Sequence, residues 1–439
     1  MELSEELDRL TDPDGNLKRV DELVYLEDGT LVVVLSGSVG ETGTRLFHVP
    51  PGASGLLPSG RVEEVDGLWP AGDRVLVAAD GGLSLIDLEG KQSEVTALPE
   101  DSGSVDVSWT ENGLRAGAIV QAAADDDDQI EIYPKARGTV ALRTYAPDKG
   151  WVERAQIPSG CGGLSISRDG RRLAWREPLN VVPEEAMRGQ FRGYDCDRDE
   201  LVCFTENAGK ARQIIVHPAG DGVAYVANFS QDRPVTTHTD LWWQSWDNGE
   251  RVNLTGGGRS IDGIGWCPDG SSVWVSIVDG TRRVTVLFGL DGKQRRGGWA
   301  AQHGGASSDV AWCGGELAFE TESAADYPRI QCGSKSITLP QPEAFDDIRC
   351  TVHQWTASDG LQVQGVVWDL EGTPGDAPVL VRAGRPSARG HFRWKVYGSI
   401  NKADNCRRAI QQEISMSMCK RCDTLGFFAP QFLTNGARR

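Results

Sequence analysis

The sequence is short of positive charge. Lys and Arg number 45 against 63 Asp and Glu, so the 439-residue chain carries a formal net charge of −18. A surface this acidic argues against duplex DNA or RNA as the main partner, because phosphate binding needs clustered cations. It also argues against an anionic membrane surface. We therefore expect neither a nucleic-acid partner nor a membrane.

Targeting signals are also missing. The N-terminal stretch has neither the basic start nor the apolar core of a secretory signal. No run of about 18 apolar residues that could form a transmembrane helix occurs anywhere. The ten cysteines stand at scattered spacings and are interpreted as free, largely buried thiols in a reducing compartment. These observations predict a cytoplasmic protein.

Glycine and tryptophan, by contrast, are plentiful, at 53 and 14 residues. One unit recurs along the chain: an apolar or Trp-bearing strand, a tight turn that contains glycine, and a second alternating strand. Asp-Gly or Asn-Gly would supply the positive φ angles of a two-residue hairpin turn. The turn glycines of the seven units are Gly29, Gly72, Gly113, Gly170, Gly222, Gly270 and Gly315.

The strands of this unit alternate in polarity. Val75 and Val77, like Val273 and Val275, mark half-buried strands. A second, looser hairpin follows most units, so each repeat of about 40–50 residues supplies four strands, as a propeller blade does. Seven repeats fit between Val20 and about Pro340, which predicts a seven-bladed β-propeller. A β-sandwich with accidental spacing is the alternative.

A different pattern follows the repeats, in residues 351–386. Ser358, Asp359 and Gly360 form a turn signal between two strands, and a buried strand, APVLVR, comes next. This order resembles the junction of prolyl-oligopeptidase-family serine peptidases, the group that holds dipeptidyl peptidases and acylaminoacyl peptidases. The units SRDGRRLAW and WCPDGSSVW also resemble the blade motif of that family. The resemblance implies a propeller followed by an α/β-hydrolase domain that cleaves peptides, and we expect no cofactor.

The pattern departs from the family at the loop that should read His-Gly-Gly-Pro. Here it reads Ala383, Gly384, Arg385 and Pro386. In the family this loop lies near the oxyanion hole, where small residues let backbone N–H groups face the developing negative charge. Arg385 replaces a glycine and Ala383 removes the imidazole, so we interpret these four residues as a remnant of the oxyanion loop.

Catalysis by a serine triad is not expected of this chain. From Thr351 only 89 residues remain, whereas a doubly wound hydrolase domain needs about 200–250. The nucleophile elbow Gly-x-Ser-x-Gly is absent from the sequence. After the propeller only His353 and His391 occur, and both precede any elbow; the earlier ones, such as His217, are interpreted as hairpin or core histidines. The prediction is a truncated beginning of an α/β-hydrolase domain with no catalytic residues.

Acidic pairs and runs offer weaker site candidates. Glu184 and Glu185 invite comparison with the paired glutamates by which some dipeptidyl peptidases hold a substrate's amino terminus, and an exposed acidic loop is the alternative. The run Asp125–Asp128 lacks the alternate ligand spacing and turn glycine of a calcium loop, so we interpret it as a solvated loop.

The tail 401–439 has a different composition. It carries a charge of +4, from seven Lys or Arg and three Asp or Glu, while the rest of the chain carries −22. Cys406, Cys419 and Cys422 could form a zinc site only with a fourth ligand such as His391, and their spacing is irregular, so we expect no metal. We expect the chain to leave the family pattern near Arg389.

These features predict four segments: 1–19, the propeller 20–345, the start of a hydrolase-like domain 346–400, and the basic tail 401–439. Two functions stay open. The chain is either the propeller part of a peptidase of dipeptidyl- or acylaminoacyl-peptidase type, inactive alone, or a non-catalytic propeller that binds a protein or peptide. Its partner would be a peptide substrate or a protein, and homo-oligomer formation is left open.

Overall fold

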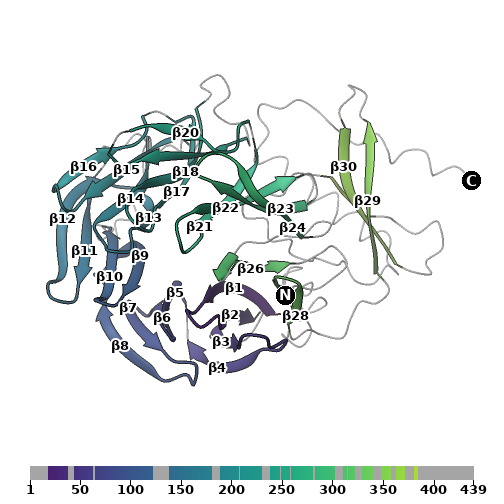
Figure 1. Ribbon diagram of the computed structural model, residues 1–439, viewed down its shortest axis with the longest axis horizontal. Helices are drawn as coiled ribbons and strands as arrows, with labels where there is room; N and C mark the ends of the chain where they lie inside the picture. The colour runs from purple at the N-terminus through teal and green to yellow at the C-terminus, as the bar shows by residue number, and fades with distance from the viewer. Residues whose placement is uncertain are drawn as a thin grey trace, which may run out of the picture. The chain divides into compact units, whose positions relative to one another are not determined.

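The computed structural model describes residues 18–37, 44–62, 65–121, 138–179, 188–206, 208–229, 238–247, 249–257, 259–279, 282–301, 310–313, 315–321, 329–339, 348–356, 362–370 and 380–383. Every regular element within these ranges is a β-strand. The first 28 strands form seven four-stranded antiparallel sheets in chain order, and the last three form a separate sheet (Figure 1).

Each four-stranded sheet is one blade, in which four consecutive strands pair as a meander. The blades are β1–β4 (Lys18–Tyr25, Leu31–Gly37, Thr44–Val49, Leu57–Val62), β5–β8 (Gly67–Ala71, Arg74–Ala79, Gly82–Ile86, Gln92–Ala97), β9–β12 (Ser102–Thr110, Gly113–Val120, Thr139–Ala146, Gly150–Pro158), β13–β16 (Gly162–Ile166, Arg172–Pro178, Gly189–Asp195, Glu200–Cys203), β17–β20 (Lys210–Val216, Gly222–Asn228, Asp240–Ser245, Arg251–Asn253), β21–β24 (Ile261–Trp266, Ser272–Asp279, Arg282–Gly289, Gln294–Ala301) and β25–β28 (Val310–Cys313, Glu316–Thr321, Arg329–Cys332, Lys335–Thr338).

The blades follow one another around a central axis (Figure 1). The first strand of each blade lies innermost, and β1, β5, β9, β13, β17 and β21 each contact the first strand of the next or the previous blade. Strand β1 also contacts β25, which brings the first and the last blade together. The seven-bladed β-propeller that the repeat predicts is therefore confirmed.

The hydrophobic core is divided into layers between neighbouring blades. In blade 2, Val75, Leu76 and Val77 are at most 1% exposed, so strand β6 is buried on both faces. The sequence-based interpretation of this strand as half-buried, with Val75 and Val77 on its one buried face, is therefore wrong. A second strand lies in the middle of its blade and is covered by a neighbouring blade on each side, whereas the alternation rule assumes one solvated face.

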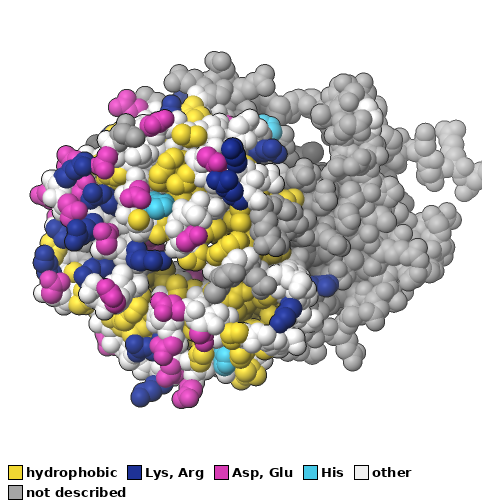
Figure 2. All heavy atoms as spheres, in the orientation of Figure 1, with side chains coloured by type: hydrophobic (Ala, Val, Ile, Leu, Met, Phe, Trp, Pro, Cys, Tyr) yellow, Lys and Arg dark blue, Asp and Glu magenta, His cyan; other side chains and the backbone are white. Residues whose placement is uncertain are grey.

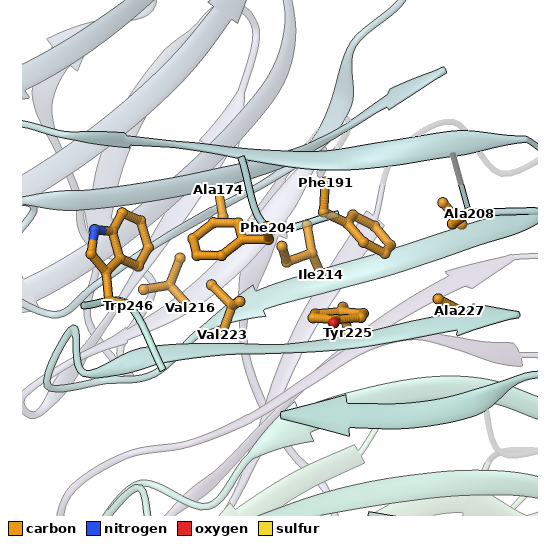
Figure 3. Packing of buried hydrophobic residues seen from close by; sticks show 11 residues of the cluster. Ala174, Phe191, Phe204, Ala208, Ile214, Val216, Val223, Tyr225, Ala227 and Trp246 are labelled. Carbon is orange, nitrogen blue, oxygen red and sulfur yellow. The ribbon is translucent and has the colours of Figure 1, made fainter. Parts of the chain in front are cut away.

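One such layer joins blades 4 and 5 (Figure 3). Phe191 of β15 packs at a tilt against Tyr225 of β18 with ring centroids 5.1 Å apart, and Phe204 meets Trp246 edge-on at 4.9 Å. Smaller side chains such as Ala174 and Ala227 fill the space between the rings. These tilted and edge-on geometries favour aromatic pairs beyond the area that they bury.

Glycines shape the turns between the first and second strands. Two residues connect these strands in blades 2 and 3, as predicted, whereas the connection is longer in blades 1, 4 and 6. Five residues separate β13 from β14, and Gly170, at φ 76°, donates its N–H to Ser167 O over 2.9 Å. The same five-residue connection carries Gly29 and Gly270. The predicted two-residue turn is wrong at these Asp-Gly sites, because glycine takes its positive φ after a first turn rather than at the centre of a tight loop.

In blade 5 the predicted turn glycine is also misplaced. Gly222 is the first residue of β18, while Gly220, at φ 79°, makes the turn and donates its N–H to His217 O over 2.7 Å. Gly170, Gly220 and Gly270 are therefore spaced by 50 residues each. The repeat in this part of the chain is more regular than the sequence reading indicated.

Side chains of one innermost strand bond to the backbone of the next. Asp106 of β9 accepts Ile166 N–H of β13 at 2.8 Å, and Ser165 of β13 accepts Val216 N–H of β17 at 3.0 Å. The Gln213 side chain of β17 bonds both the N–H and the C=O of Ile264 in β21, at 3.3 Å each. The innermost strand is an edge strand of its sheet, and the backbone groups on its free edge have no partner strand. These side-chain hydrogen bonds satisfy those backbone groups.

The last three strands form their own antiparallel sheet, with β29 (Ile348–Thr356), β30 (Gln362–Leu370) and β31 (Leu380–Ala383) in that order. Thr356 pairs with Gln362, so the strands on either side of the predicted Ser358–Gly360 turn are antiparallel neighbours. This pairing agrees with the strand, turn and strand expected there. Ser358–Gly360 themselves lie outside the described residues.

Candidate functional site

A basin opens at the centre of the propeller, on the face that carries the turns between first and second strands. We call this face the turn face. The basin has a volume of about 1400 Å³ and is lined by residues of all seven blades. Strand 1 of every blade ends at this face, so each blade presents the end of its innermost strand and the following turn to the basin.

Aromatic side chains line the basin. Tyr25, Trp69, Trp109 and Trp312 come from blades 1, 2, 3 and 7. The indole of Trp69 is held in place, because its Nε1–H donates to Asp106 Oδ1 over 3.1 Å. Flat rings of this kind offer apolar contact area with few rotatable bonds, which suits a binding surface.

Asp106 lies where three blades meet. Its carboxylate accepts hydrogen bonds from Trp69 of blade 2, from Ile166 N–H of blade 4 and from its own neighbour Val107 N–H. Burial raises the pKa of Asp106 to about 6, although the three hydrogen bonds act in the opposite direction. The group links blades 2, 3 and 4 and changes its charge near neutral pH.

His217 lines the basin as a structural residue. Ala219 N–H donates to His217 Nδ1 over 3.2 Å, so that nitrogen is an acceptor, and Nε2–H then donates to Gly270 O over 3.1 Å. The ring also packs edge-on against Trp243 and Trp266. Both ring nitrogens are engaged, which confirms the prediction of a hairpin histidine.

The basin extends outward between blades 3 and 4. Blade 3 contributes Arg115 of β10, Arg154 of β12 and residues of the β11–β12 turn, including Lys149. Blade 4 contributes the β13–β14 turn and, from its outer turn, Cys196 and Asp197. We call this extension the blade 3–4 groove. On the face shown in Figure 2, cationic and anionic side chains are interspersed over the region of β11–β16.

The thiols of Cys196 and Cys267 are not activated nucleophiles. Burial raises the pKa of Cys196 to about 11 and that of Cys267 to about 12, so both remain protonated at neutral pH. The expectation of free, largely buried cysteines holds in part: Cys161 and Cys267 are buried, whereas Cys203 is exposed. In the ranges that the structure covers, no three potential ligands converge on a metal position.

The site residues that the sequence proposed are mostly outside the described ranges. Glu184 and Glu185 lie there, as do Gly384, Arg385 and Pro386. Ala383 is the last residue of β31 and pairs with Gly365 of β30. Sequence reasoning missed Arg115 and Arg154, because isolated arginines in alternating strands carry no motif; only the stacking of two blades assigns them to one groove.

The comparisons with known proteins bear on the fold. No family model and no curated protein matches the chain. Several solved structures, by contrast, match the chain. The fold is similar to that of prolyl oligopeptidases and acylaminoacyl peptidases. The acylaminoacyl peptidase of Pyrococcus horikoshii matches with a TM-score of 0.63 at 11% identity, over 83% of this chain and 60% of that one.

Prolyl oligopeptidase B of Galerina marginata gives similar matches. Its apo form has a TM-score of 0.59 at 11% identity, over 85% of this chain and 58% of that one. The same protein bound to a 25mer macrocyclization substrate matches with a TM-score of 0.56 at 12% identity, over 85% and 58%. This chain thus spans less than two thirds of the length of these structures.

The matches extend beyond the propeller. All residues up to Thr338, the end of β28, amount to 77% of the 439-residue chain, which is 338 divided by 439. The matched share is 83–85%, so part of each match must lie after the last blade.

Among the described residues, no helix is long and apolar enough to cross a membrane.

Proposed function

We propose that this chain is the propeller part of a prolyl-oligopeptidase-type serine peptidase and that peptides are its ligands. The observation that carries the proposal is the order of the fold: seven meander blades, then an antiparallel sheet, with structural similarity to prolyl oligopeptidases and acylaminoacyl peptidases that continues past the last blade. The turn-face basin, open and lined by aromatic rings, is of a size that admits a peptide segment.

In this proposal the strands β29–β31 are the start of a hydrolase domain, and Ala383, Gly384, Arg385 and Pro386 are the remnant of its oxyanion loop. Cleavage of dipeptides or acylated residues would belong to a longer protein, because this chain has no Gly-x-Ser-x-Gly elbow. In the same proposal, Glu184 and Glu185 are the candidates for holding a peptide's amino terminus. A cytoplasmic location and the predicted boundaries at 345 and 400 belong to the same proposal.

The second candidate function is a non-catalytic propeller that binds a peptide or protein. The same basin favours it, since basins at the centre of a rigid ring serve recognition without chemistry. The two candidates differ in what the chain does to a bound peptide, so the deciding measurement follows both binding and cleavage.

The experiment incubates the purified chain with chromogenic dipeptidyl and acyl-amino-acid substrates and with a fluorophosphonate probe, using an intact prolyl oligopeptidase as the positive control. The expected result is no turnover and no labelled serine, with saturable binding of a fluorescent peptide in an anisotropy titration. Covalent labelling of a serine would show that this chain is itself catalytic. Absence of binding across a panel of neutral, basic and acidic peptides would reject peptides as its ligands.

A further inference from the structure

The blade 3–4 groove contains two arginines that are half-buried and face a shared space. Arg115 stands near the start of β10, and its side chain packs against the β13–β14 turn, where a Cβ added to Gly170 would come within 3.0–3.2 Å of it. Arg154 stands on β12 and its Nε–H donates to Thr144 Oγ1 over 2.7 Å. Both side chains line the same cavity.

Arg154 acts electrostatically across the boundary between the blades. Its positive charge lowers the pKa of the Cys196 thiol in blade 4, against the larger and opposite effect of burial. Since Nε is the only guanidinium nitrogen of Arg154 with a hydrogen bond inside the described chain, its two terminal nitrogens keep their N–H groups available. Arg115 makes one such bond, from Nη1 to Leu114 O at 3.3 Å.

Neither arginine has an acidic partner among the described residues. Within the described part of the chain, no carboxylate oxygen lies within 4 Å of the guanidinium of Arg115 or Arg154. The carboxylates of blade 4 that line the groove are already engaged, since Arg171 lies 3.7 Å from Asp169 and 3.6 Å from Asp197. Among the described residues, these two half-buried cations therefore form no ion pair, in a protein with a net charge of −18.

We infer that the blade 3–4 groove is a binding site for a carboxylate of a peptide ligand, held by Arg115 and Arg154. Planar guanidinium groups match the two oxygens of a carboxylate and form charge-assisted hydrogen bonds with it. The groove opens into the aromatic basin, so the peptide chain that bears the acidic group can continue toward Trp109. The inference deepens the proposed function and rests on it for the peptide nature of the ligand.

Preference for an acidic ligand is unexpected from the overall charge. A surface with 18 excess negative charges repels acidic peptides at long range, but at physiological salt this repulsion is screened within about 8 Å. Inside the groove the contact between the ligand carboxylate and the arginines is direct and partly shielded from solvent. The local cations therefore determine which peptide binds. The site would then select an acidic residue at one position of a peptide rather than acidic peptides in general.

The test is an anisotropy titration of the full chain with two fluorescent peptides that differ in one position, Glu against Gln, in an otherwise neutral glycine- and alanine-based sequence. We expect the Glu peptide to bind about tenfold more tightly, and the variants Arg115→Gln and Arg154→Gln each to remove most of that preference. Arg154→Lys keeps the charge without the fork and should restore only part of it.

Arg295→Gln is the matched control, because Arg295, near the start of β24, is an exposed arginine that pairs at 3.0 Å with Asp291 of the β23–β24 turn. It should leave both affinities unchanged, and circular dichroism checks that each variant is folded. Equal binding of both peptides would overturn the inference while leaving the proposed function intact. Failure of every peptide to bind would reject both. If inorganic phosphate displaced the fluorescent Glu peptide at the same concentration as a free acidic peptide does, the groove would be an unselective anion site. That result would also overturn the inference.

Discussion

Asp106 provides a sharp test of how the propeller's inner ring is held together. The carboxylate accepts hydrogen bonds from Trp69 Nε1 at 3.1 Å and Ile166 N–H at 2.8 Å, so it joins residues 37 and 60 positions away along the chain. Burial raises its pKa from 3.8 to about 6. The perturbation is Asp106→Asn, which preserves the shape of the side chain and removes its titration.

The direction of the pH effect on stability follows from the raised pKa of Asp106. Because the pKa of Asp106 is higher in the folded than in the unfolded chain, the folded state binds the proton more tightly. The stabilisation from protonation is therefore absent well above pH 6, grows as the pH falls through 6, and is complete below 3.8. Between about pH 7.5 and pH 5 the folded state gains about 1.4 kcal/mol, a tenfold factor. The variant lacks this gain.

The assay is urea unfolding followed by tryptophan fluorescence at three pH values. The free energy of unfolding of the wild type minus that of Asp106→Asn should increase by about 1.4 kcal/mol from pH 7.5 to pH 5. Asp148→Asn, an exposed carboxylate on the β11–β12 turn of the same blade, is the control for the loss of any acidic residue. A difference that stays constant with pH would refute the raised pKa.

Two further predictions concern backbone geometry and packing. Gly90→Ala should lower the free energy of unfolding by about 3 kcal/mol or more, because Gly90 has φ 84° and an added Cβ would lie 2.1 Å from Ser59 O. Gly72→Ala, at φ 69° in open space, should lower it by only about 1 kcal/mol, and equal losses in urea unfolding would contradict the clash. Phe191→Ala should lower the free energy of unfolding by about 3–5 kcal/mol, because the Phe191 ring is fully buried between blades 4 and 5. Leu201→Ala should lower it by less than about 0.5 kcal/mol, because Leu201 is 55% exposed. Similar melting temperatures for these two variants would contradict the interblade core.

The turn glycines made the number of blades predictable. A positive φ is a local requirement that glycine meets without strain, so Gly29, Gly170 and Gly270 mark their turns in the sequence itself. The exact turn was less readable. Gly220 and Gly222 stand two residues apart, and the positive φ of Gly220 and the hydrogen bond from its N–H to His217 O distinguish the turn residue from the first residue of a strand.

Burial was predicted less well than topology. Alternating polarity indicated one buried face for β6, yet Val75, Leu76 and Val77 are all buried because a neighbouring blade covers each side. The reading of the resemblance placed site candidates at Glu184, Glu185 and 383–386, of which the structure describes only Ala383. The basin and its arginines had no counterpart in the sequence reading.

The sequence by itself determined the count and order of the strands, because turn chemistry and strand polarity act between residues close in the chain. It also determined the absence of a nucleophile elbow, which is a matter of pattern alone. Tertiary structure decided which side chains meet. Asp106 acquires its partners, and Arg115 and Arg154 come to line one groove, only when blades 2, 3 and 4 stack around the axis. Contacts between separate blades depend on that stacking geometry, which no local pattern encodes.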